Sequence, residues 1–179
     1  IFGGLNYDPN RKGPAAFDHD RSIWRASKSD PTRRFEVVEG LELPAARRAF
    51  AGAVFNGKYV IVGGMKDGFQ LVEDCLEFDF EKRTFAPFPC PASRLSGDLI
   101  PAGGKLYLVG GSVKAGEDVK ETRRIDVYDP KTKKWTDLGF ELPFSTRHLR
   151  AQPYRDQILL LSTHSTEKDM TVAILNPGL

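Results

Sequence analysis

The side chains of this sequence that could bind a ligand are arginines and histidines spread along the chain. The candidates for ligand or partner binding are Arg47, Arg94, Arg147, His148, His19 and His164. A planar guanidinium binds a carboxylate through two parallel hydrogen bonds, so the arginines could hold an anion or an acidic side chain. One interpretation is that these six residues bind a ligand or a protein partner. The alternative is structural: the arginines pair with acids of nearby loops, and the histidines are ordinary solvated residues.

No pattern in the sequence is typical of a catalytic centre. The three histidines are widely separated and have no cysteine or carboxylate at ligand spacing, which argues against zinc. A nucleophile elbow, a phosphate-binding loop and a pair of Cys-x-x-Cys motifs are all missing from the sequence. We therefore predict no catalytic residue, no metal and no cofactor, and the sequence leans away from an enzyme.

Composition argues against two classes of partner. The chain of 179 residues carries a formal net charge of only +2, whereas a nucleic-acid-binding domain normally concentrates basic residues on one surface. No apolar run approaches the roughly 20 residues that a membrane-spanning helix needs. We predict neither nucleic acid nor a membrane as a partner. The start, Ile1-Phe2-Gly3-Gly4, has no initiator methionine and no signal-peptide core, so we expect an internal piece of a longer chain.

A repeated unit must position the candidate residues. A hydrophobic run ends in Gly63-Gly64 and is followed by Phe78-Asp79 and then Phe85. The same pattern returns as Gly110-Gly111, Tyr128-Asp129 and Trp135, and the two units are offset by 47 residues, from Pro44 to Pro91. A unit of this length cannot bury its own hydrophobic face, so it must stack on copies of itself.

Each unit is predicted to form four short antiparallel strands separated by turns rich in Gly, Asn, Asp-Pro and Lys. The strands of the two full units are predicted at 51–55, 59–62, 75–80 and 85–88, and at 96–100, 106–109, 124–128 and 135–138. Two partial units flank them, with strands at 1–4, 21–26 and 35–38, and at 149–154, 158–161 and 171–175. Ser162-Thr163 stands in the last unit where the others have Gly-Gly.

The Gly-Gly, Tyr-Asp and Trp positions resemble the kelch motif, and the chain resembles part of a kelch-type β-propeller. The resemblance implies an all-β fold, an arc of four-stranded antiparallel blades of which two are complete and two partial. It implies a single incomplete domain with blades at 1–42, 43–90, 91–142 and 143–179. It also implies that Phe85 and Trp135, on the fourth strands, pack between neighbouring blades.

The resemblance further implies a non-catalytic scaffold for protein–protein interaction that acts through its inter-strand loops. The alternative is a propeller that binds or converts a carbohydrate or small acid, similar to sialate mutarotase or galactose oxidase. A propeller closes with roughly four to eight blades. We therefore expect a protein partner, and further blades from the same polypeptide or another chain to close the ring.

The resemblance sorts the loops onto two faces. The six candidate residues fall in loops that follow second strands and in the links between blades. The opposite face gathers basic turns at 33–34, 82–83 and 131–134, which could dock an acidic partner or simply keep the turns soluble.

The two cysteines can be placed by strand register. If Phe80 pairs with Phe85, positions that sum to 165 face each other, and Cys75 then lies opposite Cys90. Opposition alone does not make a bond. We predict two free, half-buried thiols, which weakly favour a reducing, cytoplasmic compartment.

Overall fold

The computed structural model describes residues 1–27, 29, 32, 34–67, 70–92, 94–163 and 170–177. In this described part the chain is built of β-strands and one 3-10 helix, η1 (Gly13–Ala16), so the predicted all-β fold is confirmed. The chain divides into two compact units, Ile1–Ala49 with Met65–Gln70, and Phe50–Gly64 with Leu71–Leu179. Each unit is described separately below.

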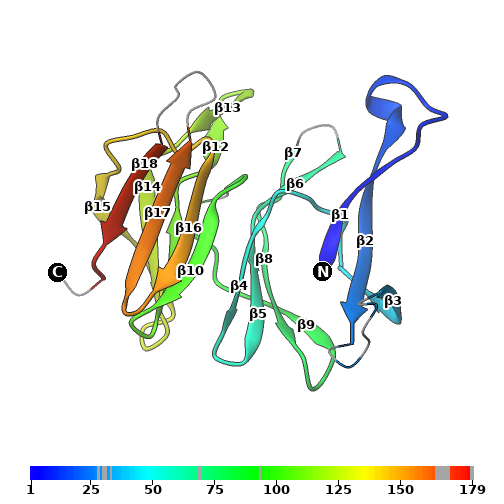
Figure 1. Ribbon diagram of the computed structural model, residues 1–179, viewed down its shortest axis with the longest axis horizontal. Coiled ribbons are helices and arrows are strands. Elements are labelled where there is room, and N and C mark those ends of the chain that lie inside the picture. The colour runs from blue at the N-terminus through cyan, green and yellow to red at the C-terminus, as the bar shows by residue number, and fades with distance from the viewer. Residues whose placement is uncertain are drawn as a thin grey trace. The chain divides into compact units, whose positions relative to one another are not determined.

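The first unit contains a three-stranded antiparallel sheet in the order β1 (Phe2–Tyr7), β2 (Phe17–Ala26) and β3 (Phe35–Glu42) (Figure 1). All three strands run further than the sequence predicts. The register shifts between Ser22 and Trp24, and β3 passes through Gly40 at a φ of +69°. Such an irregularity lets a strand continue beyond a glycine.

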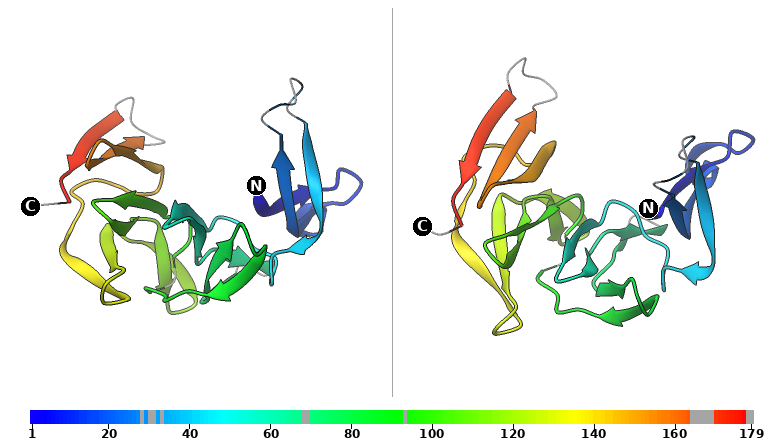
Figure 2. Two further views of the ribbon diagram at one scale, coloured as in Figure 1. Left: turned by 90° about the horizontal axis from the view of Figure 1, so that it is seen from below. Right: turned by 60° about the horizontal axis from the view of Figure 1, so that its bottom comes forward.

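The described part of the second unit contains three larger sheets, and paired strands within each are antiparallel. The first is a four-stranded sheet of β4 (Ala51–Phe55), β5 (Lys58–Val62), β8 (Cys75–Asp79) and β9 (Thr84–Pro87). The second is a four-stranded sheet of β10 (Asp98–Ala102), β11 (Lys105–Val109), β14 (Arg124–Asp129) and β15 (Lys134–Glu141). The third has β16 (Leu149–Tyr154), β17 (Gln157–Thr163) and β18 (Met170–Leu175), and both views of Figure 2 show it, in orange and red, beside the second sheet.

Two short hairpins project from the loops after the second strands. One pairs β6 (Met65–Lys66) with β7 (Gln70–Leu71), and the other pairs β12 (Ser112–Ala115) with β13 (Asp118–Glu121). The sequence analysis treats both segments as plain loops. Each of the four larger sheets falls inside one of the four predicted blade ranges; that these ranges form one domain stays a prediction.

Neighbouring sheets of the second unit share their cores. Successive side chains of a strand point to opposite faces, and β11 is buried on both. Leu106 and Leu108 pack with Val60 and Val62 of the first sheet, whereas Val109 packs with Ile158 and others of the third. Sheet packs on sheet, as expected for a unit that cannot bury its face alone.

Close contacts between blades explain the glycine pairs. Gly63 has a φ of +62°, and a Cβ there would collide with the backbone of Arg94, which leads into the next sheet. Gly110 has a φ of +59°, and a Cβ would lie 2.5 Å from Cβ of Thr146, which leads into the sheet after that. Both the backbone conformation and the space therefore require glycine at the ends of β5 and β11.

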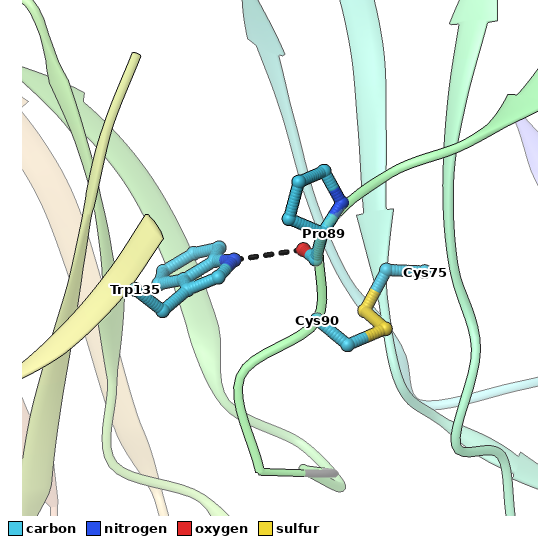
Figure 3. The surroundings of a disulfide bond; sticks show 4 residues. All are labelled: Cys75, Pro89, Cys90 and Trp135. Carbon is cyan, nitrogen blue, oxygen red and sulfur yellow. Dashed lines mark hydrogen bonds between the residues drawn. A yellow bond between two sulfur atoms is a disulfide. The ribbon is translucent and has the colours of Figure 1, made fainter. Parts of the chain in front are cut away.

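Trp135 joins two sheets as predicted. Its ring packs on Tyr128 at 5.4 Å between centroids, and its Nε1–H donates a 2.7 Å hydrogen bond to the carbonyl of Pro89, just after β9 (Figure 3). Phe85 instead contacts Phe78 of its own sheet, with centroids 4.8 Å apart. Both Trp135 and Phe85 are half-buried rather than buried.

The cysteine prediction is wrong in two respects. Phe85 pairs with Phe78, two residues earlier than expected, so Cys75 does not lie opposite Cys90. Cys75 instead accepts a hydrogen bond at its carbonyl from the N–H of Phe88, and Cys90 lies two residues beyond. The two Cα atoms are 5.4 Å apart and the sulfurs form a disulfide, so neither cysteine is free (Figure 3). The argument from free thiols for a reducing compartment is thereby lost.

Candidate functional site

Residues 88–95, in the segment between β9 and β10, are the centre of the candidate site, and we call them the linker. Its first part is held at three successive residues. Phe88 donates a 2.9 Å backbone hydrogen bond to the carbonyl of Cys75. The carbonyl of Pro89 accepts a hydrogen bond from Trp135, and Cys90 is in the disulfide (Figure 3). These contacts attach the linker to both sheets that it connects.

The end of the linker is held by backbone contacts. The carbonyl of Arg94 accepts a 2.9 Å hydrogen bond from the N–H of Gly64. Leu95 exchanges two backbone hydrogen bonds with Ser112, of 2.9 and 2.8 Å, which form an isolated antiparallel bridge to β12. The linker is thus fixed before and after Pro91 and Ala92.

The Arg94 guanidinium lies in a buried ion-pair network. Nη1 donates a 2.8 Å hydrogen bond to the carbonyl of Gly110, and Nη2 pairs with the carboxylate of Asp126. Arg124 reaches the same carboxylate at 3.0 Å. Burial lowers the pKa of Arg94, and the Asp126 carboxylate opposes that shift. An arginine keeps its charge even so, and its carboxylate partner stabilises it within the sheet.

This burial favours the structural alternative for two of the six predicted residues. Arg94 and Arg47 both have a relative exposure of 0%. An anion could reach the Arg94 guanidinium only if the network with Asp126 opened. In this structure the guanidinium of Arg94 binds groups of the protein itself.

The link between β15 and β16 carries two exposed candidates, Arg147 and His148. The preceding residue, Thr146, is buried; its N–H donates to Glu121 at 2.5 Å and its hydroxyl to the carbonyl of Thr122 at 2.7 Å. Burial alone would raise the pKa of Glu121, but the hydrogen bonds from Thr146 and Ser145 lower it overall. Glu121 therefore accepts as a carboxylate and fixes the link that presents Arg147 and His148.

His19 lies in the first unit and is not an ordinary solvated residue. Its side chain is only 8% exposed. Arg48 Nε donates to His19 Nε2 at 3.1 Å, and His19 Nδ1 lies 2.5 Å from the Asp67 carboxylate. Because arginine only donates, Nε2 is the acceptor, and the proton of the neutral ring sits on Nδ1 facing Asp67. His164 falls outside the described residues.

The loop after β11 shows a feature that the sequence analysis missed. In an antiparallel strand, the backbone N–H and C=O groups of successive residues point alternately to one edge of the strand and to the other. Gly111 accepts from Thr122 on the β13 side, whereas Ser112 bonds Leu95 on the other side. The backbone of Lys114 therefore faces the same edge as Ser112, and among the described residues the pairing of the linker with β12 ends at Leu95.

A pocket of about 360 Å³ opens where the linker and β12 diverge. It is lined by Glu73, Pro91, Ala92, Val113 and Lys114. Pro91 and Val113 are half-buried, and the other three are exposed. Its lining thus combines three apolar residues with one acidic and one basic side chain. The sequence signal that could have found the hairpin is a glycine turn at Gly116 between two short segments of similar length.

The described residues include no cluster of three or more His, Cys, Asp or Glu side chains able to hold a metal ion. No helix found in the described residues is long and apolar enough to cross a membrane.

Comparison with known proteins agrees with this architecture. A family model described as the Kelch motif matches residues 102–139. Kelch-like protein 41b of Danio rerio is 28% identical over 137 residues, covering 73% of this chain and 20% of the relative. Kelch repeat and BTB domain-containing protein 13 of Mus musculus is 33% identical over 120 residues, covering 63% of this chain and 25% of the relative. The chain thus spans a quarter or less of the length of these curated relatives.

A solved structure described as the structure of YjhT is similar in fold. Its TM-score is 0.65 at 15% identity, and the match covers 89% of this chain and 57% of that one. The chain thus contains a match to the Kelch motif and is similar to kelch-repeat proteins, and its four-stranded antiparallel sheets agree with the fold of a kelch-type β-propeller.

Proposed function

We propose that this chain is a non-catalytic interaction module that binds a protein partner through its inter-strand loops and links. The observation that carries the proposal is the way the linker is held, by the disulfide and Trp135 at one end and by Arg94 and Leu95 at the other. Loops that are fixed on a rigid scaffold present a binding surface at little cost in conformational entropy.

The six candidate residues take two roles in this proposal. Arg147 and His148 are exposed and contact the partner directly. Arg94 and Arg47 are buried, and Arg94 holds the carbonyl of Gly110. His19, between Arg48 and Asp67, orders the loops of the first unit. His164 is proposed only from its place in the sequence.

Closure of the ring by further blades is part of the same proposal. The outermost strand of the third sheet, β18, exposes Met170, Val172 and Ile174 on one face, each more than half accessible. Leu159 and Leu161 of β17 pair with Ile174 and Val172 and share that face. An apolar face of this kind normally packs against another element.

The test is to identify partners by pull-down and to measure their affinity for paired variants. Arg147→Ala with His148→Ala is expected to weaken binding by roughly tenfold, the loss of one or two charge-assisted contacts. The control is Lys131→Ala with Lys133→Ala, which changes the basic turn after β14 and is expected to leave affinity unchanged. If the lysine variant loses affinity and the Arg147 and His148 variant does not, the partner binds at the basic turns instead.

A further inference from the structure

The covalent attachment of the linker is chemically reversible. The disulfide joins Cys75, the first residue of β8, to Cys90 of the linker (Figure 3). A dithiol opens such a bond by thiol–disulfide exchange, and an oxidised dithiol closes it again. The same chain therefore has two forms, one with the linker bonded to the sheet and one without that bond.

The two cysteines differ in their access to a thiol. Cys75 has a relative exposure of 4% and belongs to an apolar cluster, against which Phe88 and Trp135 pack. Cys90 is exposed. Exchange requires a thiolate to reach one of the two sulfurs, so a thiol from solvent meets the sulfur of Cys90 first.

The stretch from Pro89 to Ala92 depends on the disulfide more than on packing. Pro89, Cys90 and Ala92 are exposed and Pro91 is half-buried, so the stretch buries little apolar surface. The two prolines have no N–H to donate to a neighbouring strand. The hydrogen bond from Trp135 to Pro89 is exposed, and water competes for both of its groups. Loss of the disulfide would leave this stretch weakly attached.

The far end of the linker has an attachment of its own. Arg94 is buried and pairs with Asp126. Leu95 exchanges two backbone hydrogen bonds with Ser112. These contacts do not involve either cysteine. Opening the disulfide should therefore release residues 89–92 and leave Leu95 in place.

We propose that the Cys75–Cys90 disulfide is a redox switch, which holds residues 89–92 against the sheet when it is oxidised and releases them when it is reduced. Cys90 is the residue whose sulfur the incoming thiol attacks. The inference rests on the proposed function only for its consequence: a partner that contacts the linker binds the oxidised form more tightly. The released stretch would have to be ordered again on binding, which costs conformational entropy.

The reductant is a dithiol, and the exchange has two steps. In the first, one thiolate of the dithiol bonds to the sulfur of Cys90, the S–S bond breaks, and its electron pair goes to the sulfur of Cys75. A thiolate is poorly stabilised among apolar side chains, so Cys75 takes up a proton from water. In the second step, the other thiolate of the dithiol attacks the dithiol sulfur of the mixed disulfide and expels Cys90, which also takes up a proton. The dithiol becomes a cyclic disulfide and gives up the two protons and two electrons that the cysteines gain.

The first experiment identifies the attacked sulfur. The protein is treated briefly with the monothiol cysteamine, quenched with N-ethylmaleimide in mildly acidic urea and digested with trypsin. Trypsin cleaves after Lys82 and Arg83, between the two cysteines, so mass spectrometry assigns each modification to one cysteine. We expect cysteamine on Cys90 and maleimide on Cys75. Cysteamine on Cys75 would overturn the assignment of Cys90.

The second experiment measures hydrogen exchange by NMR, without a partner. The indole N–H of Trp135 reports on the released stretch because it donates to the carbonyl of Pro89. We expect dithiothreitol to accelerate its exchange by about tenfold, since the protected form is no longer held by the cross-link. The N–H of Leu95, bonded to Ser112, is the internal control and should change by less than about twofold.

The matched variant is Cys75→Ser with Cys90→Ser. Its Trp135 indole should exchange at the rate of the reduced wild type, and dithiothreitol should not change that rate. This variant separates loss of the disulfide from any other effect of the reductant.

Each result decides between the switch and its alternatives. Equal exchange at Trp135 in the oxidised and reduced wild type would overturn the switch. Equal acceleration at Trp135 and Leu95 would also overturn it, because the disulfide would then stabilise the whole unit rather than the linker. Both experiments are made without a partner, so a failure to find one overturns the proposed function and leaves the switch standing.

Discussion

Gly63 ends β5 in a backbone conformation that other residues rarely adopt, next to the backbone of Arg94. We predict that Gly63→Ala lowers the free energy of unfolding by about 3 kcal/mol, from the left-handed φ and the steric overlap together. Urea denaturation of the purified protein measures this loss.

The control for that substitution is Gly104→Ala. Gly104 has a φ of +74° but nothing within 4 Å of a built Cβ. Gly104→Ala should lower the free energy of unfolding by only about 1 kcal/mol, because it carries the cost of the left-handed φ without a steric overlap. Equal losses at the two glycines would contradict the close contact between Gly63 and Arg94.

Asp98 couples the stability of the second unit to pH. Burial raises the pKa of Asp98, and the 2.6 Å hydrogen bond from the N–H of Ala151 opposes that shift only in part. The folded state then holds its proton more tightly than the unfolded state. Stability should therefore fall as pH rises from the ordinary carboxyl pKa through the raised one.

Asp98→Asn tests this coupling, because the amide oxygen can still accept from Ala151 and has no proton to lose. We predict that the free energy of unfolding of the variant exceeds that of the wild type increasingly across this pH range. Urea titrations at a series of pH values measure the difference. Parallel pH profiles for the two proteins would show that Asp98 is not desolvated.

At the scale of elements, the linker depends on its covalent attachment. The disulfide closes a sequence separation of 15 residues between Cys75 and Cys90. We predict that Cys75→Ser with Cys90→Ser lowers the free energy of unfolding by about 3 kcal/mol, the chain-entropy value for a loop of this size. Wild type in reductant should match the variant in urea denaturation. A wild type that is indifferent to reductant would restore the free-thiol prediction.

The sequence predicts the main strands well because their signal is local. Strand β4 and strand β16 begin and end at the predicted residues. The apolar run of β4 stops at the Asn56-Gly57 turn, and β16 alternates apolar Leu149, Ala151 and Pro153 with the polar Arg150 and Gln152. Strand β15 extends to Glu141 because Gly139, at a φ of +77°, lets it continue past an irregularity. A glycine in the sequence of a strand is compatible either with the end of the strand or with a bulge that lets the strand continue.

Register and burial could not be read from the sequence. The pairing of Phe78 with Phe85, rather than Phe80 with Phe85, depends on the geometry of the intervening turn. A shift of two residues keeps every side chain on its face, so the hydrophobic pattern does not distinguish the two registers. The same limit applies to Arg94, whose partner Asp126 lies 32 residues away and meets it only in the folded sheet.

At the scale of the whole molecule, the apolar face of β18 predicts association. Met170 and Val172 are each 56% exposed, and Ile174 is 52% exposed. We predict that the 179-residue chain alone self-associates, and that Val172→Lys with Ile174→Lys reduces this association by charging the face. Sedimentation velocity measures both. A monodisperse 20 kDa wild-type monomer would contradict the prediction.

The contact of Gly63 with the backbone of Arg94 has a consequence for how such a chain can evolve. At this junction Gly63 of one blade has no side chain and lies against main-chain atoms of Arg94 in the next blade. The N–H of Gly64 also donates a hydrogen bond to the carbonyl of Arg94. Main-chain atoms are the same whatever residue supplies them. A duplicated or exchanged blade would therefore meet a junction that it already fits, while its loops are free to diverge toward new partners.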